Sequence, residues 1–233
     1  MNLKLHWLAR TCLSAIAVVL SGCGGGGDTA SGPTDYPVST AFDRLLVTQA
    51  VFSATTTDGT ASLSLTFTPG AQAKFTATSP TSKTISISTV VRQNGAVNST
   101  DQSSIYFNTA PTSFIAAFNV AVQDSPIIPQ TAKVGSSGRA YFTPGNGRGL
   151  FSVPPQEGTW SLEAGSNGKA WLCLTNKLGY GLLSSPSFEV TYINTYCFSI
   201  DAAGVASGFK ATLQTDRRST LRTPVVDTSQ FGN

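Results

Sequence analysis

The sequence predicts an all-β domain, an antiparallel β-sandwich or barrel-like fold with one short N-terminal helix. Ser and Thr together number 58 of the 233 residues, whereas Glu occurs three times and Lys seven times. Helices favour Ala, Leu, Glu and Lys, while Thr and other β-branched residues suit the pleated surface of a sheet. Apolar runs of strand length are separated by Gly, Pro, Asn and Ser, which is typical of sandwiches and barrels.

The first 22 residues have the layout of a secretory signal peptide. Lys4 and Arg10 flank the start of the segment, and an apolar run extends from Cys12 to Leu20. This run is about half of the roughly 20 residues that span a bilayer. It ends in Leu20-Ser21-Gly22-Cys23, which resembles the lipobox of bacterial lipoproteins. The resemblance implies cleavage before Cys23 and lipid attachment to its sulfur and new amino group, and an uncleaved membrane anchor is the alternative.

The resemblance to lipoproteins also bears on location. In that family an aspartate directly after the cysteine favours retention in the inner membrane, but here the position is Gly24. The resemblance therefore implies a lipid anchor in the outer membrane, on the periplasmic face or alternatively at the cell surface. The Gly-, Ser- and Pro-rich segment that follows predicts a flexible tether over 23–38. The sandwich domain is expected over 39–222, with a possible subdivision near 123–130 and a C-terminal tail over 223–233.

A helix is expected at the start of the domain. Thr40 and Asp43 fit the spacing of a capping box, in which Thr40 would be the N-cap. Three apolar residues then share one helical face: Phe42, Leu45 and Leu46. The pattern predicts a short helix over 41–47.

A hairpin is expected next, because Asp58-Gly59 lies between two β-rich runs and favours a tight turn. Folding the chain there places six apolar residues on one face, with Ala50 opposite Phe67, Phe52 opposite Leu65 and Ala54 opposite Leu63. Pro69-Gly70 is expected to end the second strand. A further turn is predicted at Asn94-Gly95.

The remaining strands are predicted from alternation and punctuation. In the first half they are expected around Phe75 and Ala77, at Ile85 and Ile87, over 105–107 and over 114–122, the last of which also fits a helical period. Beyond the break at 123–130 they are expected over 140–143, 149–153, 159–163, 169–175, 188–200 and 205–215.

Two cysteines remain once Cys12 leaves with the signal and Cys23 carries lipid. Cys173 and Cys197 are an even pair in an oxidising compartment, which predicts a disulfide. If they lie opposite each other in an antiparallel pair of strands, Leu172 lies opposite Phe198 and Leu174 opposite Tyr196. These four residues then share one face of the sheet, and Trp171 shares the other face with the cysteines. Alternatively, the bridge joins two sheets. No metal site is expected, since two thiols without a histidine are too few ligands for zinc.

The second half of the chain, from about Pro129 to Leu213, resembles uncharacterised proteobacterial lipoproteins of unknown function. The stretches that carry this resemblance are Ala132-Lys133-Val134-Gly135, Trp160-Ser161-Leu162-Glu163, Ala170-Trp171-Leu172-Cys173 and Gly208-Phe209-Lys210. The resemblance implies no particular activity.

Several classes of function are excluded by what the chain lacks. The only histidine is His6 in the signal, so the mature chain cannot form Ser-His-Asp or Cys-His catalytic sites. Without Lys4 and Arg10 there remain 13 basic and 12 acidic residues, a balance that argues against a nucleic-acid partner. No phosphate-binding glycine pattern occurs, so no cofactor is expected. Glycoside hydrolysis needs only two carboxylates, and the available ones are Glu157, Glu163, Glu189 and Asp201.

Three functions follow from this reading. The leading hypothesis is a non-catalytic lipoprotein with a structural or assembly role in the envelope, bound to the membrane by its lipid and to a protein partner. The alternative is a module that binds a glycan or a protein through a loop around Tyr180, with Leu182, Leu183 and Trp171 as contact residues. That loop could instead fold back as a lid. A glycoside-active enzyme is the third hypothesis. Trp160, Tyr192 and Tyr196 share strand parity with core residues and are expected to be buried.

Overall fold

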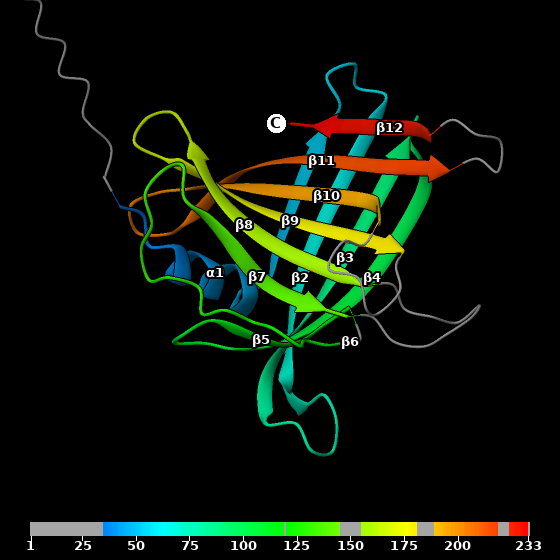
Figure 1. Cartoon of the computed structure of the whole chain (residues 1–233). Helices are drawn as coiled ribbons and strands as arrows, with labels where there is room; N and C mark the ends of the chain where they lie inside the picture. The colour runs from blue at the N-terminus through cyan, green and yellow to red at the C-terminus, as the bar shows by residue number, and fades with distance from the viewer. Residues whose placement is uncertain (1–34, 119, 145–154, 181–188, 219–223, 233) are drawn as a thin grey trace, which may run out of the picture.

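The computed structural model describes residues 35–118, 120–144, 155–180, 189–218 and 224–232. Within these ranges, twelve strands form two antiparallel six-stranded sheets, ordered β1-β2-β3-β4-β5-β6 and β12-β11-β10-β9-β8-β7 (Figure 1). The first sheet contains β1 (Ala50–Thr55), β2 (Ala61–Lys74), β3 (Thr81–Gln93), β4 (Ala96–Asn108), β5 (Ser113–Ala117) and β6 (Val120–Ala121). The second contains β7 (Ser137–Thr143), β8 (Gln156–Ala164), β9 (Ala170–Tyr180), β10 (Glu189–Ile200), β11 (Ala206–Arg218) and β12 (Pro224–Phe231).

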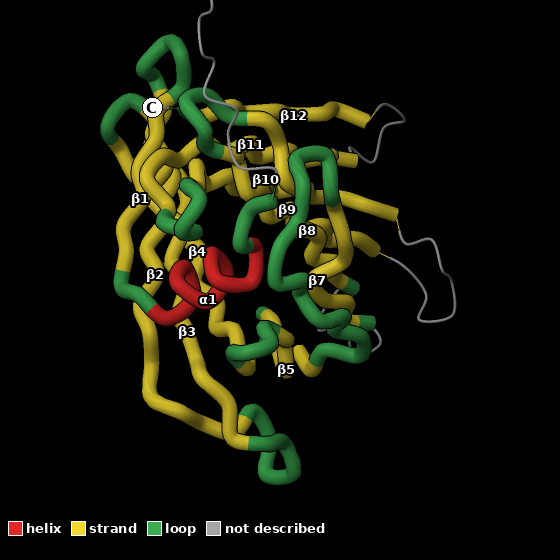
Figure 2. The backbone as a smooth tube through the Cα atoms, turned by 90° about the vertical axis from the view of Figure 1, so that its left-hand side faces the viewer, coloured by secondary structure: helices red, strands yellow, loops and turns green. Residues whose placement is uncertain are grey.

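The two sheets pack face to face as a sandwich, which confirms the predicted fold class and excludes a closed barrel. The strands of the second sheet run across those of the first, and helix α1 (Val38–Val47) lies at one end (Figures 1 and 2). Single bridges join the sheets at two corners, Thr55 to Gly232 and Asp124 to Phe142. One hydrophobic core contains residues from α1 and both sheets. The segment 123–130 therefore connects two sheets that share a core, and it contributes Ile128 to that core.

Helix α1 begins three residues before the predicted start. Its N-cap is Pro37, whose carbonyl oxygen accepts a hydrogen bond from the Ala41 N–H at 2.9 Å, and no side chain caps it. The predicted capping box is wrong, because Thr40 lies inside the helix and Asp43 accepts a hydrogen bond from Thr112 at 2.5 Å. The predicted apolar face is buried: Phe42, Leu45 and Leu46 are all at most 5% exposed.

The first hairpin has the predicted register in full, with Ala50 opposite Phe67, Phe52 opposite Leu65 and Ala54 opposite Leu63. The prediction that Pro69-Gly70 ends the second strand is wrong, because β2 continues to Lys74. The pairing of β1 with β2 reaches only as far as Phe67, so beyond that residue β2 is paired with β3 alone, and Pro69 lies opposite Ile85 there. A register shift after Gly70 marks a bulge at this point.

The expected strand around Phe75 and Ala77 is also absent, since both lie in the connection between β2 and β3 (Figure 1). The turn at Asn94-Gly95 is confirmed, and both residues have positive φ, as a two-residue turn of this kind requires. The ambiguous segment 114–122 is two short strands, separated at Phe118, where φ is 52°.

The second sheet matches the predicted strands closely, although 149–153 lies outside the described residues. The strand β12 occupies most of the segment that the sequence indicated as a tail, and it pairs with β11 along its whole length. Phe231 at its end is 4% exposed and joins the core. The folded domain therefore runs from about Tyr36, which pairs with Ala132, to the last described residues of the chain.

The cysteine prediction is confirmed in both bond and register. Cys173 and Cys197 form a disulfide between directly opposite positions of β9 and β10. The neighbouring pairs are as predicted: Leu172 opposite Phe198 and Leu174 opposite Tyr196. The bridge therefore lies within one sheet rather than between two.

No helix in the described ranges is long and apolar enough to cross a membrane.

Candidate functional site

A cavity of about 420 Å³ lies between the two sheets. Protein interiors are close-packed, and voids larger than a water molecule are few, so a space of this size requires an explanation. Ligand pockets typically measure about 300–1,000 Å³ and have mostly apolar walls with a few polar groups. Both the size and the lining of this cavity fall within that description.

The deep end of the cavity is apolar. Helix α1 and the neighbouring strands close it with side chains that are at most 5% exposed: Phe42, Leu46, Leu65, Phe67 and Phe114. Phe198 of β10 lies on the opposite wall and is fully buried. Water would find few hydrogen-bond partners here, and apolar cavities of roughly 150 Å³ already stay dry and bind small apolar molecules.

The other end of the cavity is polar and open to solvent. Ser99 and Asp101 of β4 and Tyr192 of β10 line it and are exposed, Tyr192 by 45%. Asn194 lies between Tyr192 and Tyr196 along the same wall. The cavity therefore has an apolar interior and a polar mouth, which is the arrangement that suits an amphiphilic ligand.

Two tyrosines on the cavity wall are held neutral. Burial raises the pKa of Tyr141 far above its usual value, and its hydroxyl donates a hydrogen bond to Oδ1 of Asn176 at 3.0 Å. Burial also raises the pKa of Tyr196, and the nearby carboxylate of Asp101 raises it further, although a hydrogen bond with Thr89 works in the opposite direction. Neither side chain can act as a base at neutral pH, so both serve to shape and polarise the wall.

Of the predicted contact residues, only Tyr180 and Trp171 lie within the described part of the chain, and both belong to β9. Tyr180 is the last residue of β9, where it pairs with Glu189, and so it does not lie in a loop as expected. Leu182 and Leu183 lie outside the described residues. Trp171 lies at the opposite end of β9, about 30 Å away along the strand at roughly 3.3 Å per residue. Trp171 and Tyr180 therefore cannot contact one small ligand together.

Trp171 belongs to the outer face of the second sheet, beside the disulfide. The ammonium group of Lys210 lies 4.8 Å from the centre of its ring and pairs with Glu163 at 3.1 Å. A shallow depression of about 370 Å³ lies here, half polar and lined by Glu163, Lys210 and Cys197 among others. Glu163 approaches both cysteine sulfurs, but those sulfurs are bonded to each other and are not free to hold a metal ion.

The remaining aromatic predictions are confirmed in part. Trp160 is buried, as expected, at 5% exposure. Tyr196 is partly buried and packs against the core, while the expectation of a buried Tyr192 is wrong. A register shift between Val190 and Tyr192 occurs near the beginning of β10, where the strand reaches the cavity mouth.

The candidate carboxylates for glycoside hydrolysis have other partners. Glu157 and Glu163 are six residues apart on β8, about 20 Å at roughly 3.3 Å per residue, whereas the enzymes need about 5–9.5 Å. Asp201 accepts hydrogen bonds from the backbone N–H groups of Val205 and Ala203, which lower its pKa. The side chain of Glu189 lies outside the described set.

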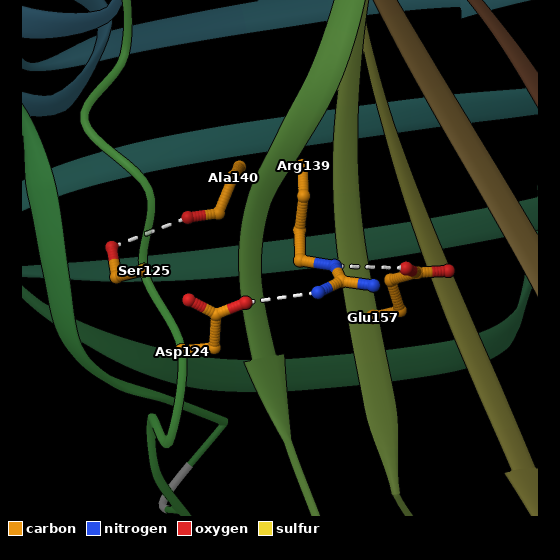
Figure 3. Close-up of polar contacts among 5 residues, drawn as sticks. All are labelled: Asp124, Ser125, Arg139, Ala140 and Glu157. Carbon is orange, nitrogen blue, oxygen red and sulfur yellow. Dashed lines mark hydrogen bonds and ion pairs between the residues drawn. The ribbon is translucent and has the colours of Figure 1, made fainter. Parts of the chain in front are cut away.

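Glu157 is part of a surface ion-pair cluster where the chain crosses between the sheets (Figure 3). The guanidinium of Arg139 bridges Asp124 at 2.9 Å and Glu157 at 3.1 Å, and Lys177 lies 3.7 Å from Glu157. The hydrogen bond that Arg139 donates to Asp124 raises the pKa of the guanidinium most, and the one that it donates to Glu157 raises that pKa further. The cluster ties the crossover to β7 and β8, which is a structural role, and exposed pairs of this kind are each worth about 0–1 kcal/mol.

The residues at the cavity mouth were not identified from the sequence. Asp101 and Ser103 share strand parity with Ile105 and Phe107, so a polar stretch continues a core-facing row of β4. That pattern indicates polar side chains that face the interior of the sandwich. It does not identify a binding site by itself, because the opposite wall of the cavity comes from β10, about 90 residues later.

Comparisons of the chain with protein-family models, with curated proteins and with solved structures found no match. The resemblance to proteobacterial lipoproteins therefore stays a prediction from the sequence.

Proposed function

We propose that this protein is a lipid-anchored envelope lipoprotein whose sandwich domain binds a small apolar or amphiphilic molecule between its sheets. The observation that carries the proposal is the cavity of about 420 Å³, with its apolar interior and polar mouth. The cavity replaces the Tyr180 loop as the candidate binding site. It also favours a binding role over the purely structural or assembly role that the sequence indicated.

The chemistry at the cavity supports binding rather than catalysis. The mature chain contains no histidine, and the wall residues Tyr141 and Tyr196 remain protonated at neutral pH. We therefore propose a non-enzymatic carrier or sensor. Its location follows from the lipobox: an acylated Cys23 in the outer membrane, with the domain held on a tether at the periplasmic face.

A cavity-filling substitution tests the binding site. Ile87→Trp places a large ring in the cavity, because Ile87 lines it from β3. We expect the mature chain carrying this change to bind the neutral fluorescent probe N-phenyl-1-naphthylamine at least about tenfold more weakly, as expected when bulk occupies a ligand's space. Probe fluorescence titration measures the affinity, and thermal melting verifies that the variant is folded.

The matched control is Ser88→Trp, on the next residue of β3, whose side chain lies on the opposite face of the strand. Its affinity for the probe should equal that of the unsubstituted protein. Equal binding by a folded Ile87→Trp variant would contradict the proposed site.

A second experiment tests the lipid anchor. Cys23→Ala should move the protein from the detergent phase to the aqueous phase and abolish its labelling with an alkyne fatty acid, because all of the acyl chains attach to Cys23 and stable anchoring needs more than one chain. Cys12→Ala, a change within the apolar run of the signal, is the control and should retain the label. Membrane retention of a Cys23→Ala protein that still begins with Met1 would mean that residues 1–22 are themselves the anchor.

A further inference from the structure

The cavity has a single charged residue among its described lining residues, and that residue is Asp101. It lies opposite Thr89 in the β3–β4 ladder, on the row that faces the second sheet. None of the ion pairs found among the described side chains involves Asp101. Among the described side chains, the carboxylate of Asp101 thus has no cationic partner, and it stands at the polar mouth of a cavity whose deep end is apolar.

The opposite wall supplies aromatic rings at the same end. Tyr192 and Tyr196 lie four residues apart on β10, and both line the cavity. The charge of Asp101 is close enough to Tyr196 to contribute to its raised pKa. Aromatic faces attract cations, above all the quaternary ammonium group, whereas a carboxylate repels an anionic head group.

We propose that the ligand is a single-chain amphiphile with a cationic, ammonium-type head group, bound with its chain inside the cavity and its head between Asp101 and Tyr196. This inference rests on the proposed function, since it names the ligand class for the same cavity. The deep end provides the complementary surface for the chain, because Phe42, Leu46 and their neighbours present only apolar atoms there.

The cavity volume suits a small ligand. A volume of about 420 Å³ falls within the range of pockets that enclose a drug-sized molecule. One medium-length alkyl chain is a ligand of that size.

The test compares three ligands that share one alkyl chain and differ in charge: dodecyltrimethylammonium, dodecanol and dodecanoate. Each is used below its micelle concentration to displace N-phenyl-1-naphthylamine from the mature chain at neutral pH. An exposed ion pair and a cation–π contact each contribute up to about fivefold in affinity. We therefore expect the ammonium ligand to bind about tenfold more tightly than dodecanoate, with dodecanol between them, and the preference to shrink at high salt.

Substitutions that change the charge at Asp101 then test whether this residue causes the preference for the ammonium ligand. Asp101→Asn should weaken the ammonium ligand by up to about fivefold, toward dodecanol, while leaving dodecanol unchanged, and Asp101→Lys should make dodecanoate the tightest of the three. The control is Glu163→Gln, which alters net charge equally on the outer face of the second sheet and should preserve the original order.

The outcomes separate this inference from the proposed function. Equal binding of the three ligands, or an order that Asp101→Asn and Asp101→Lys do not change, would overturn the cationic ligand while leaving an apolar binding site intact. Failure of all three ligands and of the probe to bind would remove the proposed function together with it.

Discussion

Replacing Phe198 with alanine should cost about 3–5 kcal/mol of the free energy of unfolding, the usual range for a buried phenylalanine. Phe198 is fully buried at the centre of the sandwich. Its ring lies 4.9 Å from that of Phe52, 6.0 Å from that of Phe67 and 5.5 Å from that of Phe209. The substitution removes contacts between the two sheets as well as within one, so the structure has little freedom to collapse around the gap.

Urea unfolding of the mature chain, followed by fluorescence and circular dichroism, measures this effect. The control is Val51→Ala on β1, where the side chain is 62% exposed and the loss should stay within about 0.5 kcal/mol. At roughly 2–4 °C per kcal/mol for a domain of this size, Phe198→Ala should melt about 6–20 °C lower. A loss below about 1 kcal/mol would mean that the sheets do not pack through Phe198.

Removing the Cys173–Cys197 disulfide should cost about 3 kcal/mol. The bond closes a loop of 24 residues, and the loss of loop-closure entropy in the unfolded chain accounts for a value of this size, on a model that attributes the effect to the unfolded state. Cys173 and Cys197 are almost completely buried, at 1% and 5% exposure, so reductant should reach them only after local opening. The measurement is the urea midpoint of the Cys173→Ala, Cys197→Ala double variant.

The oxidised and reduced forms of the unsubstituted protein provide the matching comparison, since they differ in the bond but not in side-chain volume. Peptide mapping without reductant should show the two cysteines linked in protein taken from the envelope. Free thiols at both positions in that material would contradict the bond, and equal stability of the two forms would contradict its expected contribution.

Some residues of the hydrophobic core also line the cavity, so the stability of the sandwich and the binding of a ligand depend on the same side chains. Phe198 lines the cavity as well as the core, so Phe198→Ala should enlarge the cavity while destabilising the sandwich. A bound ligand stabilises the folded state by mass action. We therefore expect saturating ligand to recover part of the loss for Phe198→Ala, as it should for any core variant that keeps its affinity for the ligand.

Local sequence patterns were sufficient where turn chemistry and alternation agreed. Asp58-Gly59 and the apolar row of the first hairpin specify the same register, because a slip of one residue would turn the whole row outward. Parity around Cys173 and Cys197 predicted the β9–β10 register for the same reason. The fold class, the disulfide and the apolar face of α1 all depend on contacts between residues that are near in sequence or periodic along it.

Strand ends and the binding cavity depend on neighbours that the sequence does not place. Pro69 continues a strand because β3 pairs with it there, where β1 does not extend, and Tyr180 belongs to β9 because β10 pairs with it there. Asp101 and Tyr192 meet at one mouth only after two sheets, each assembled separately, pack against each other. Periodicity assigns a residue to a face of its strand, but the space in front of that face is set by side chains from the opposite sheet, about 90 residues away along the chain.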